Sequence, residues 1–312
     1  MTGDAAPGAA SGQGTVAPDP RLGVPDVLFF CIGAQKAGTS WLHFFLKSHP
    51  DVCLPPMKEM HYWNTIARAP QPGPDGMPQP VTAYPRDGDS ARRQAILDSR
   101  DASHASYAAF MLRRHKSERV LGEITPDYQN LSLDMLCTMA GLNSDTRFIF
   151  LMRDPVERLN SGIRKRIRGR SGNDRKQPIS GAMIVQEMKD MLDAGFMKQI
   201  DRSRYDRTLP KLDRLVERTG GRARVGLFFY EDILLRRNTD PVCDFLSIAR
   251  RPGDFDTIAN PGNPVVDDCA QEFLDLAMKP YAKTYQYMAD RFGTALPPEW
   301  RRQMEQANAT FA

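Results

Sequence analysis

A short apolar run that leads into a turn of small residues constrains this chain more than any other feature. Residues 27–33 are apolar up to Gly33 and predict a buried strand, and the turn after them contains Lys36, Gly38 and Thr39 before a helix begins. Gly33 and Gly38 allow the backbone to curl so that successive N–H groups point inward, and the helix adds its positive end. The segment therefore predicts a phosphate-binding loop.

The spacing inside the loop indicates which phosphate chemistry it serves. A nucleotide-hydrolysing loop reads GxxxxGK[ST]; Gly33 and Gly38 have that spacing, but Thr39 stands at the lysine position. The lysine lies inside the turn, at Lys36. The Ser/Thr that binds magnesium in such loops directly follows the lysine, and this loop does not have that Lys-Ser/Thr pair. We predict metal-free group transfer, with a strand-to-helix turn that binds no ligand as the alternative.

Length and composition bound the class of protein. The 312 residues fit a disordered tail over 1–25, rich in Ala, Gly and Pro, and one α/β domain over 26–312. The 42 Lys and Arg against 38 Asp and Glu give a net charge of +4, too small to predict nucleic-acid binding. The tail does not have the pattern of a signal peptide, and no apolar run is long enough to span a membrane. Five cysteines without a CxxC pair predict reduced thiols and a cytoplasmic location.

Strand and helix patterns then alternate along the chain. Further strands are expected at 52–54, 119–124, 147–152 and 224–230. Helices are expected at 40–48, 90–99, 103–116, 132–141, 182–193, 208–219, 240–248 and 268–291, with a surface loop at 69–89. Continuous apolar strands of this kind predict an α/β fold with a P-loop-like central parallel sheet and helices on both faces.

A second chemical cluster follows one of these strands. Asp154 suits a helix N-cap and Pro155 the first helical turn, which places Arg153 at the carboxyl end of a central strand, where doubly wound sheets bind ligands. Ser161 follows about two turns later. Arg153 and Ser161 could hold a second phosphate. In the alternative, Arg153 pairs with Asp154 or Glu157, and Ser161 faces solvent.

Basic residues are concentrated between positions 164 and 176, with Asp174 as the one acid. They are Arg164, Lys165, Arg166, Arg168, Arg170, Arg175 and Lys176. The segment could be a lid over a nucleotide or a receptor for an anionic acceptor. It could also be a solvated helix end and loop. RNA binding is disfavoured because no aromatic residue interrupts the run.

Taken together, the motifs resemble those of sulfotransferases that use 3′-phosphoadenosine 5′-phosphosulfate (PAPS). The Lys36 loop is similar to their phosphosulfate loop, and Arg153 with Ser161 is similar to their 3′-phosphate site. The heparan-sulfate type and its bacterial relatives look most alike: residues 58–63 resemble Lys-Glu-x-His-Phe-Phe, and residues 122–128 resemble Gly-Glu-Lys-Thr-Pro-x-Tyr. The resemblance covers about residues 27–165.

The resemblance implies a role for each site residue. Nucleotide binding would fall to Lys36, Ala37, Gly38, Thr39, Ser40, Trp41, Arg153 and Ser161. Glu59 would be the general base, and Lys36 would stabilise the leaving phosphate without a metal. His61 is expected on the same side of an extended segment as Glu59, where it would orient the acceptor or share the proton. In the alternatives, His61 is structural and Glu59 only pairs with Lys58 or Lys36.

Departures from the family pattern limit the acceptor. Ile124 stands where the heparan-sulfate enzymes usually have lysine, and Asn64 where they often have aspartate. Their C-terminal cysteine pair and Lys-Gly-Arg loop are missing, with 260–264 as a candidate substitute for the loop. We therefore expect another hydroxyl or amine, on a glycan, glycolipid or small metabolite that can be anionic. A P-loop kinase and a non-catalytic adenine-nucleotide-binding protein are the alternatives, and the oligomeric state is left open.

Overall fold

A five-stranded parallel sheet forms the centre of the molecule. The computed structural model describes residues 19–68, 88–99, 103–172, 174–257, 262–266 and 270–311. The strands are β1 (Val27–Gly33), β2 (Val52–Cys53), β3 (Val120–Ile124), β4 (Thr146–Met152) and β5 (Ala223–Phe229), in the order β2-β3-β1-β4-β5. The predicted α/β fold with a parallel sheet is confirmed.

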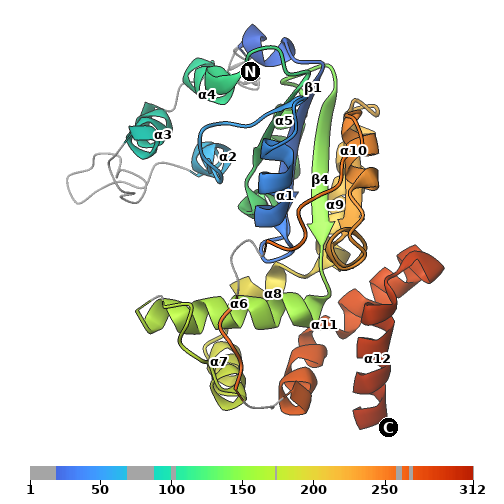
Figure 1. Cartoon of the computed structure of the whole chain (residues 1–312). Helices are drawn as coiled ribbons and strands as arrows, with labels where there is room; N and C mark the ends of the chain where they lie inside the picture. The colour runs from blue at the N-terminus through green and yellow to red at the C-terminus, as the bar shows by residue number, and fades with distance from the viewer. Residues whose placement is uncertain are drawn as a thin grey trace, which may run out of the picture.

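Helices surround this sheet (Figure 1). They are α1 (Thr39–Lys47), α2 (Tyr62–Ile66), α3 (Gly88–Ser99), α4 (Ala105–Met111), α5 (Leu133–Ala140), α6 (Pro155–Arg170), α7 (Gly181–Asp193), α8 (Lys198–Asp201), α9 (Tyr205–Arg218), α10 (Asp240–Leu246), α11 (Ala270–Phe292) and α12 (Pro298–Phe311). Short 3₁₀ turns are η1 (Pro20–Gly23), η2 (Leu112–Arg114), η3 (Pro126–Asn130) and η5 (Gly293–Ala295), and η4 (Glu231–Leu235) is a π-helix.

The strand order determines where a ligand can bind. Every residue of β1, β3 and β4 is buried, and because successive strand residues face opposite sides, both faces of the sheet are covered. The chain builds one half of the sheet from β1 to β3 and then crosses to β4 and β5 on the other side of β1. The loops after β1 and β4 therefore lie at a topological switch point, where open α/β sheets bind ligands. Figure 1 shows α6 lying across this carboxyl end.

Residues 19–25 are ordered, although the sequence placed them in a disordered tail. Residues 1–18 lie outside the described residues, but Pro20–Gly23 form η1 and Leu22 is fully buried. The Asn143 side-chain amide donates to the carbonyl oxygens of Leu22 and Pro25, at 2.9 Å each. The prediction of a disordered tail through residue 25 is thus wrong for residues 19–25, because one buried leucine and one buried amide hold them. Most of the expected 69–89 loop also lies outside the described residues.

Several helices were not predicted from the sequence, and α12 is the longest of them. Its sequence is largely polar, but Trp300 is fully buried. The Trp300 ring packs on Phe229, Tyr205 and Tyr285, with ring centroids 5.5, 5.8 and 6.2 Å away. Trp300, with an ion pair between Glu299 and Arg236, therefore anchors α12 to distant elements, and no local periodicity predicts such contacts.

The cysteines of the described residues are reduced, as predicted. Cys31, Cys53 and Cys243 are buried, Cys137 is partly exposed, and all four are free thiols. Burial raises the pKa of Cys31 to about 12, so this thiol stays protonated and unreactive near neutral pH. Cys269 lies outside the described residues. Within the described ranges, no helix combines the length and the apolar character needed to cross a membrane.

Gly122 is required by a close approach inside the sheet. It lies opposite Phe29 in the register of β1 and β3. A Cβ atom at position 122 would lie 1.8 Å from the Phe29 ring, so the ring occupies the space that any side chain would need. Gly169 in α6 differs, because its Cβ would meet nothing within 4 Å.

We therefore expect Gly122→Ala to lower the free energy of unfolding by roughly 1–3 kcal/mol, the usual cost of overpacking a core. Gly169→Ala is the matched control and should be neutral or stabilising by up to about 1 kcal/mol, because alanine favours helix. Urea denaturation followed by circular dichroism measures both. An unchanged Gly122→Ala protein would show that the close approach is not a constraint.

Candidate functional site

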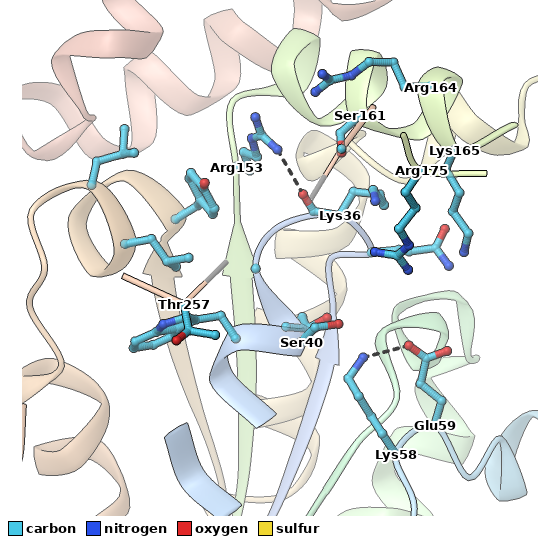
Figure 2. A pocket seen from close by; sticks show the side chains of 18 of the residues that line it. Lys36, Ser40, Lys58, Glu59, Arg153, Ser161, Arg164, Lys165, Arg175 and Thr257 are labelled. Atoms are coloured by element: carbon cyan, nitrogen blue, oxygen red, sulfur yellow. Dashed lines mark hydrogen bonds and ion pairs between the residues drawn. The ribbon is translucent and has the colours of Figure 1, made fainter. Parts of the chain in front are cut away.

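A cavity of about 600 Å³ lies at the carboxyl end of the sheet (Figure 2). It is lined by the β1–α1 loop, by residues 58–59, by α6 with the loop that follows it, and by segments after β5. The lining includes seven basic side chains, Lys36, Lys58, Arg153, Arg164, Lys165, Arg168 and Arg175, and one carboxylate, Glu59. Such a cavity is built to bind an anion of small-molecule size.

The β1–α1 loop has the backbone geometry of a phosphate cradle. The Ala34 N–H donates to Leu151 O at 2.7 Å, which anchors the loop to β4. Lys36 and Gly38 both adopt left-handed conformations, with φ of 75° and 91°. Gly38 is the N-cap of α1 and supplies no side-chain cap, so the N–H groups of the first helical turn are available to an anion.

Among the cations that line the cavity, Lys36 has the most strongly shifted pKa. Burial, together with the nearby charges of Lys165, Arg168, Arg153 and Arg164, lowers its pKa to about 8. A bound anion would offset this repulsion and restore the charged form. Lys36 is thus suited to bind an anion and to stabilise charge that develops on it.

Arg153 stands at the end of β4, as predicted. Its guanidinium pairs with Glu157 at 3.1 Å, donates to Lys36 O at 3.5 Å, and lies 4.7 Å from the centre of the Tyr230 ring. The pairing with Glu157 was one of the two interpretations of the sequence. Arg153 and Ser161 also line the same cavity, and their binding of a second phosphate stays a prediction.

The start of α6 is held by Asp154. The Asp154 Oδ1 atom accepts from the N–H groups of Val156 and Glu157, at 3.0 Å each, which confirms the predicted N-cap. The Asp154 Oδ2 atom accepts from the Tyr285 hydroxyl at 2.8 Å, and the Asp154 N–H donates to Glu231 Oε1 at 3.0 Å. Burial raises the pKa of Asp154 to about 7.

Glu59 and His61 meet, although not in the way that the sequence suggested. The segment is not extended: Glu59 and His61 have φ of 60° and 55°, and His61 is the N-cap of α2. The Glu59 N–H donates to Ile124 O at 3.2 Å, which ties it to the end of β3. The Glu59 carboxylate then lies 2.7 Å from Lys58 Nζ and 3.7 Å from His61 Nε2.

These contacts tune the two titratable groups in opposite directions. Burial alone would raise the pKa of Glu59, but its contact with His61 and the charge of Lys58 lower it to about 2. Burial alone would lower the pKa of His61, but its bonds to Glu59 and to Asn64 Oδ1, 3.0 Å from Nδ1, raise it. Glu59 is therefore a carboxylate at neutral pH, held between two donors. Its pairing with Lys58 matches one alternative interpretation, and Glu59 also lines the cavity.

The cavity gathers most of the predicted site residues. Those that line it are Lys36, Gly38, Thr39, Ser40, Trp41, Glu59, Arg153 and Ser161. Ala37 is buried behind the loop, and His61 reaches the site only through Glu59. Ile124, which stands at the lysine position of the heparan-sulfate pattern, is buried and does not line the cavity.

One wall of the cavity joins the predicted Trp41 to residues that the sequence did not predict as part of the site. The Trp41 and Phe255 rings stack with centroids 4.8 Å apart, and Trp41 Nε1 donates to Asp254 O at 2.6 Å. Tyr230 and Leu234 belong to the same wall. Tyr230 was the last residue of a predicted strand, and that position at the ligand-binding edge was the available signal. No pattern marked Phe255.

The basic segment divides between two faces of α6. Ser161, Arg164, Lys165 and Arg168 follow the i, i+3, i+4, i+7 spacing of one helix face and line the cavity, together with Arg175. Arg166 and Arg170 lie on another face and pair with Glu187. The interpretation of the whole segment as a solvated helix end is therefore wrong for Arg168, which is buried, whereas Lys165 and Arg175 are exposed at the cavity.

Comparison with known proteins identifies the family. A model of the "Sulfotransferase family" matches residues 29–208. No curated protein matched the sequence. Similar solved structures include a sulfotransferase from Alicyclobacillus acidocaldarius, with 19% identity, 89% of this chain and 98% of that chain covered, and a TM-score of 0.49.

Two further structures are sulfotransferase domains. One is from the Synechococcus PCC 7002 olefin synthase, with 16% identity, 84% and 94% coverage and a TM-score of 0.41. The other is from the curacin biosynthetic pathway, with 14% identity, 92% and 98% coverage and a TM-score of 0.42. Because these likenesses are remote, the assignment rests on the family model, which spans more than half of the chain and includes Lys36, Glu59 and Arg153. The chain belongs to the sulfotransferase family.

Proposed function

We propose that this protein transfers a sulfuryl group from PAPS to a hydroxyl or amine of a glycan, glycolipid or small metabolite. The observation that carries the proposal is the convergence of Lys36, Arg153 and Glu59, from three separate segments, on one cavity. The likeness to the heparan-sulfate type of the family and a cytoplasmic location stay predictions from the sequence.

The residues of the cavity suit the parts of PAPS. Lys36, Thr39 and Ser40, with the N-terminal end of α1, suit the 5′-phosphosulfate. Arg153 and Ser161 suit the 3′-phosphate, which would compete with Glu157 for the Arg153 guanidinium. The aromatic wall formed by Trp41 and Phe255 suits the adenine base.

The proposed reaction needs three things of the protein. An acceptor oxygen or nitrogen attacks the sulfur in line, the bond from sulfur to the 5′-phosphate oxygen breaks, and the products are the sulfated acceptor and PAP (3′-phosphoadenosine 5′-phosphate). Glu59 takes the acceptor's proton, and it becomes a stronger base when the acceptor displaces Lys58 from it. Lys36 neutralises the charge that grows on the leaving phosphate. His61 then shares the proton through its contact with Glu59.

A non-catalytic nucleotide-binding protein is the second candidate, since Glu59 is already paired with Lys58. Membership of the sulfotransferase family argues against a P-loop kinase. Thermal shift with PAP, PAPS and Mg-ATP distinguishes the donor, and release of PAP from PAPS in the presence of cell extract tests transfer. Stabilisation by PAP and PAPS with no PAP released in any extract would favour the second candidate.

Arg153 generates a prediction about the 3′-phosphate. PAP should bind at least about tenfold tighter than 5′-AMP, because a charge-assisted bond to a phosphate is worth more than about 1.4 kcal/mol. Arg153→Ala should remove most of this difference, whereas Glu157→Gln, which frees the guanidinium, should preserve or increase it. Isothermal titration calorimetry measures the affinities. Equal affinities for PAP and AMP in the wild-type protein would contradict the assignment.

Glu59 generates a prediction about turnover. Glu59→Gln keeps the shape of the side chain and removes the proton acceptor, so turnover should fall by roughly 10²–10⁴-fold while PAP affinity barely changes. The readout is the rate of PAP release with an identified acceptor or an active extract. A variant that keeps most of its turnover would transfer the base assignment to His61, and His61→Gln would then show the large loss.

Lys36 generates a prediction about pH. Since burial lowers its pKa to about 8 and only the ammonium form binds phosphate well, PAP binding should take up a proton above pH 8 and weaken as pH rises. Below pH 8 the group is already charged, so little uptake is expected. Calorimetry at pH 7 and pH 9 in buffers of different ionisation enthalpy measures the uptake. Lys36→Arg is the control, and uptake at pH 9 that persists in this variant would place the proton elsewhere.

A further inference from the structure

The cavity holds more positive charge than the proposed donor needs. Its lining has seven cations and one carboxylate. Phosphate monoesters carry about two negative charges, so PAPS with its phosphosulfate carries about four in total. Lys36 belongs to the cradle, Arg153 donates to Lys36 O, and Arg164 lies one helical turn beyond Ser161, so these three cations can neutralise most of that charge. Lys165, Arg168 and Arg175 exceed the requirement.

Two of these three cations lie across Lys36 from Arg153, which belongs to the proposed 3′-phosphate site. In the view of Figure 2, Lys165 and Arg175 are on the Glu59 side of Lys36, whereas Arg153 is on the other side. Along α6, positions 165 and 168 lie about 6 and 10 Å beyond Ser161, at about 1.5 Å per residue. The cluster therefore borders Lys36, and its members Lys165 and Arg175 lie on the Glu59 side of the cavity.

A buried asparagine builds this cluster into the fold. Asn263 is 3% exposed, and its Nδ2 donates to the carbonyl oxygens of Asp174 and Gln177, at 2.9 Å each. Its Oδ1 accepts from the guanidinium of Arg168 at 3.2 Å. Asn263 thus fixes one cation of the cluster and the two ends of the short turn that carries another, Arg175. A freely solvated loop would not need such an anchor.

We propose that Lys165, Arg168 and Arg175 form a second anion subsite, which binds a phosphate, sulfate or carboxylate group of the acceptor while Glu59 faces its hydroxyl or amine. This inference rests on the proposed function and names its substrate class: an anionic acceptor. The repulsion that lowers the pKa of Lys36 agrees with it, since Lys165 and Arg168 are the largest charge contributions after burial. An anion held there would also relieve the mutual repulsion of Arg168 and Arg175.

The test first saturates the protein with PAP and then titrates inorganic pyrophosphate, with succinate as a carboxylate arm, by calorimetry at low salt. We expect one further anion to bind. The double variant Lys165→Gln/Arg175→Gln should weaken this second event at least tenfold and change PAP affinity less than threefold. Arg170→Gln/Lys176→Gln removes the same charge from positions outside the cavity lining and should leave both events unchanged.

Asn263→Ala keeps every charge and removes the anchor, so it should weaken only the second event. Failure of PAP to bind the wild-type protein would overturn the proposed function and this inference with it. PAP binding without a second event would overturn the inference alone. If Lys165→Gln/Arg175→Gln lowers the affinity for PAP more than the affinity for pyrophosphate, the cluster is part of the nucleotide site and the inference is wrong. If both double variants lower the pyrophosphate affinity equally, general charge attraction explains the binding and the inference is also wrong.

Discussion

The buried carboxylate of Asp154 is the contact on which the site depends most. It caps α6 through two backbone N–H groups, receives the Tyr285 hydroxyl from α11, and its own N–H binds Glu231 at the start of η4. Four elements are thereby fixed to one residue. Because α6 starts here, the direction of α6, and with it the face that carries Ser161 and Lys165, is set at the end of β4.

Backbone strain supplies the second constraint. Lys36, Glu59 and His61 all adopt left-handed conformations that L-residues with side chains rarely adopt, each at a cost of about 1–3 kcal/mol. The surrounding structure holds them there: Ala34 is bonded to β4, and Glu59 is bonded to the end of β3. These strained turns direct Lys36 and Glu59 toward one cavity, although the two residues lie in separate segments of the chain. An extended chain at residues 58–63 would present them differently.

The positive charge of the cavity favours anion binding, and it destabilises the ligand-free protein because the cations repel one another. Burial and like charges around Lys36 lower its pKa to about 8, while the donors around Glu59 overcome burial and lower the pKa of Glu59 to about 2. The cations of the cavity repel one another, and a bound anion offsets this repulsion. The relief of repulsion adds to the affinity for the anion. The same arrangement keeps Glu59 ionised and paired until an acceptor competes for Lys58.

The sequence alone determined the features that depend on neighbours in the chain. Gly33 and Gly38 specify the cradle, Asp154 with Pro155 specifies the start of α6, and continuous apolar runs specify the parallel strands, because turn chemistry, capping and burial act over a few residues. The spacing of Ser161, Arg164, Lys165 and Arg168 could also have been recognised as one helix face.

Only the tertiary structure decided which distant residues complete the site. The Trp41 indole bonds Asp254, 213 positions away, and Asn263 reaches back 95 positions to Arg168. Trp300 packs α12 against Phe229 of β5. Left-handed backbone conformations, not an extended strand, bring His61 close to Glu59. These contacts depend on how complete elements pack, and each partner looks ordinary in its own sequence window. Local patterns therefore specify the elements, and packing between the elements specifies the shape and charge of the cavity.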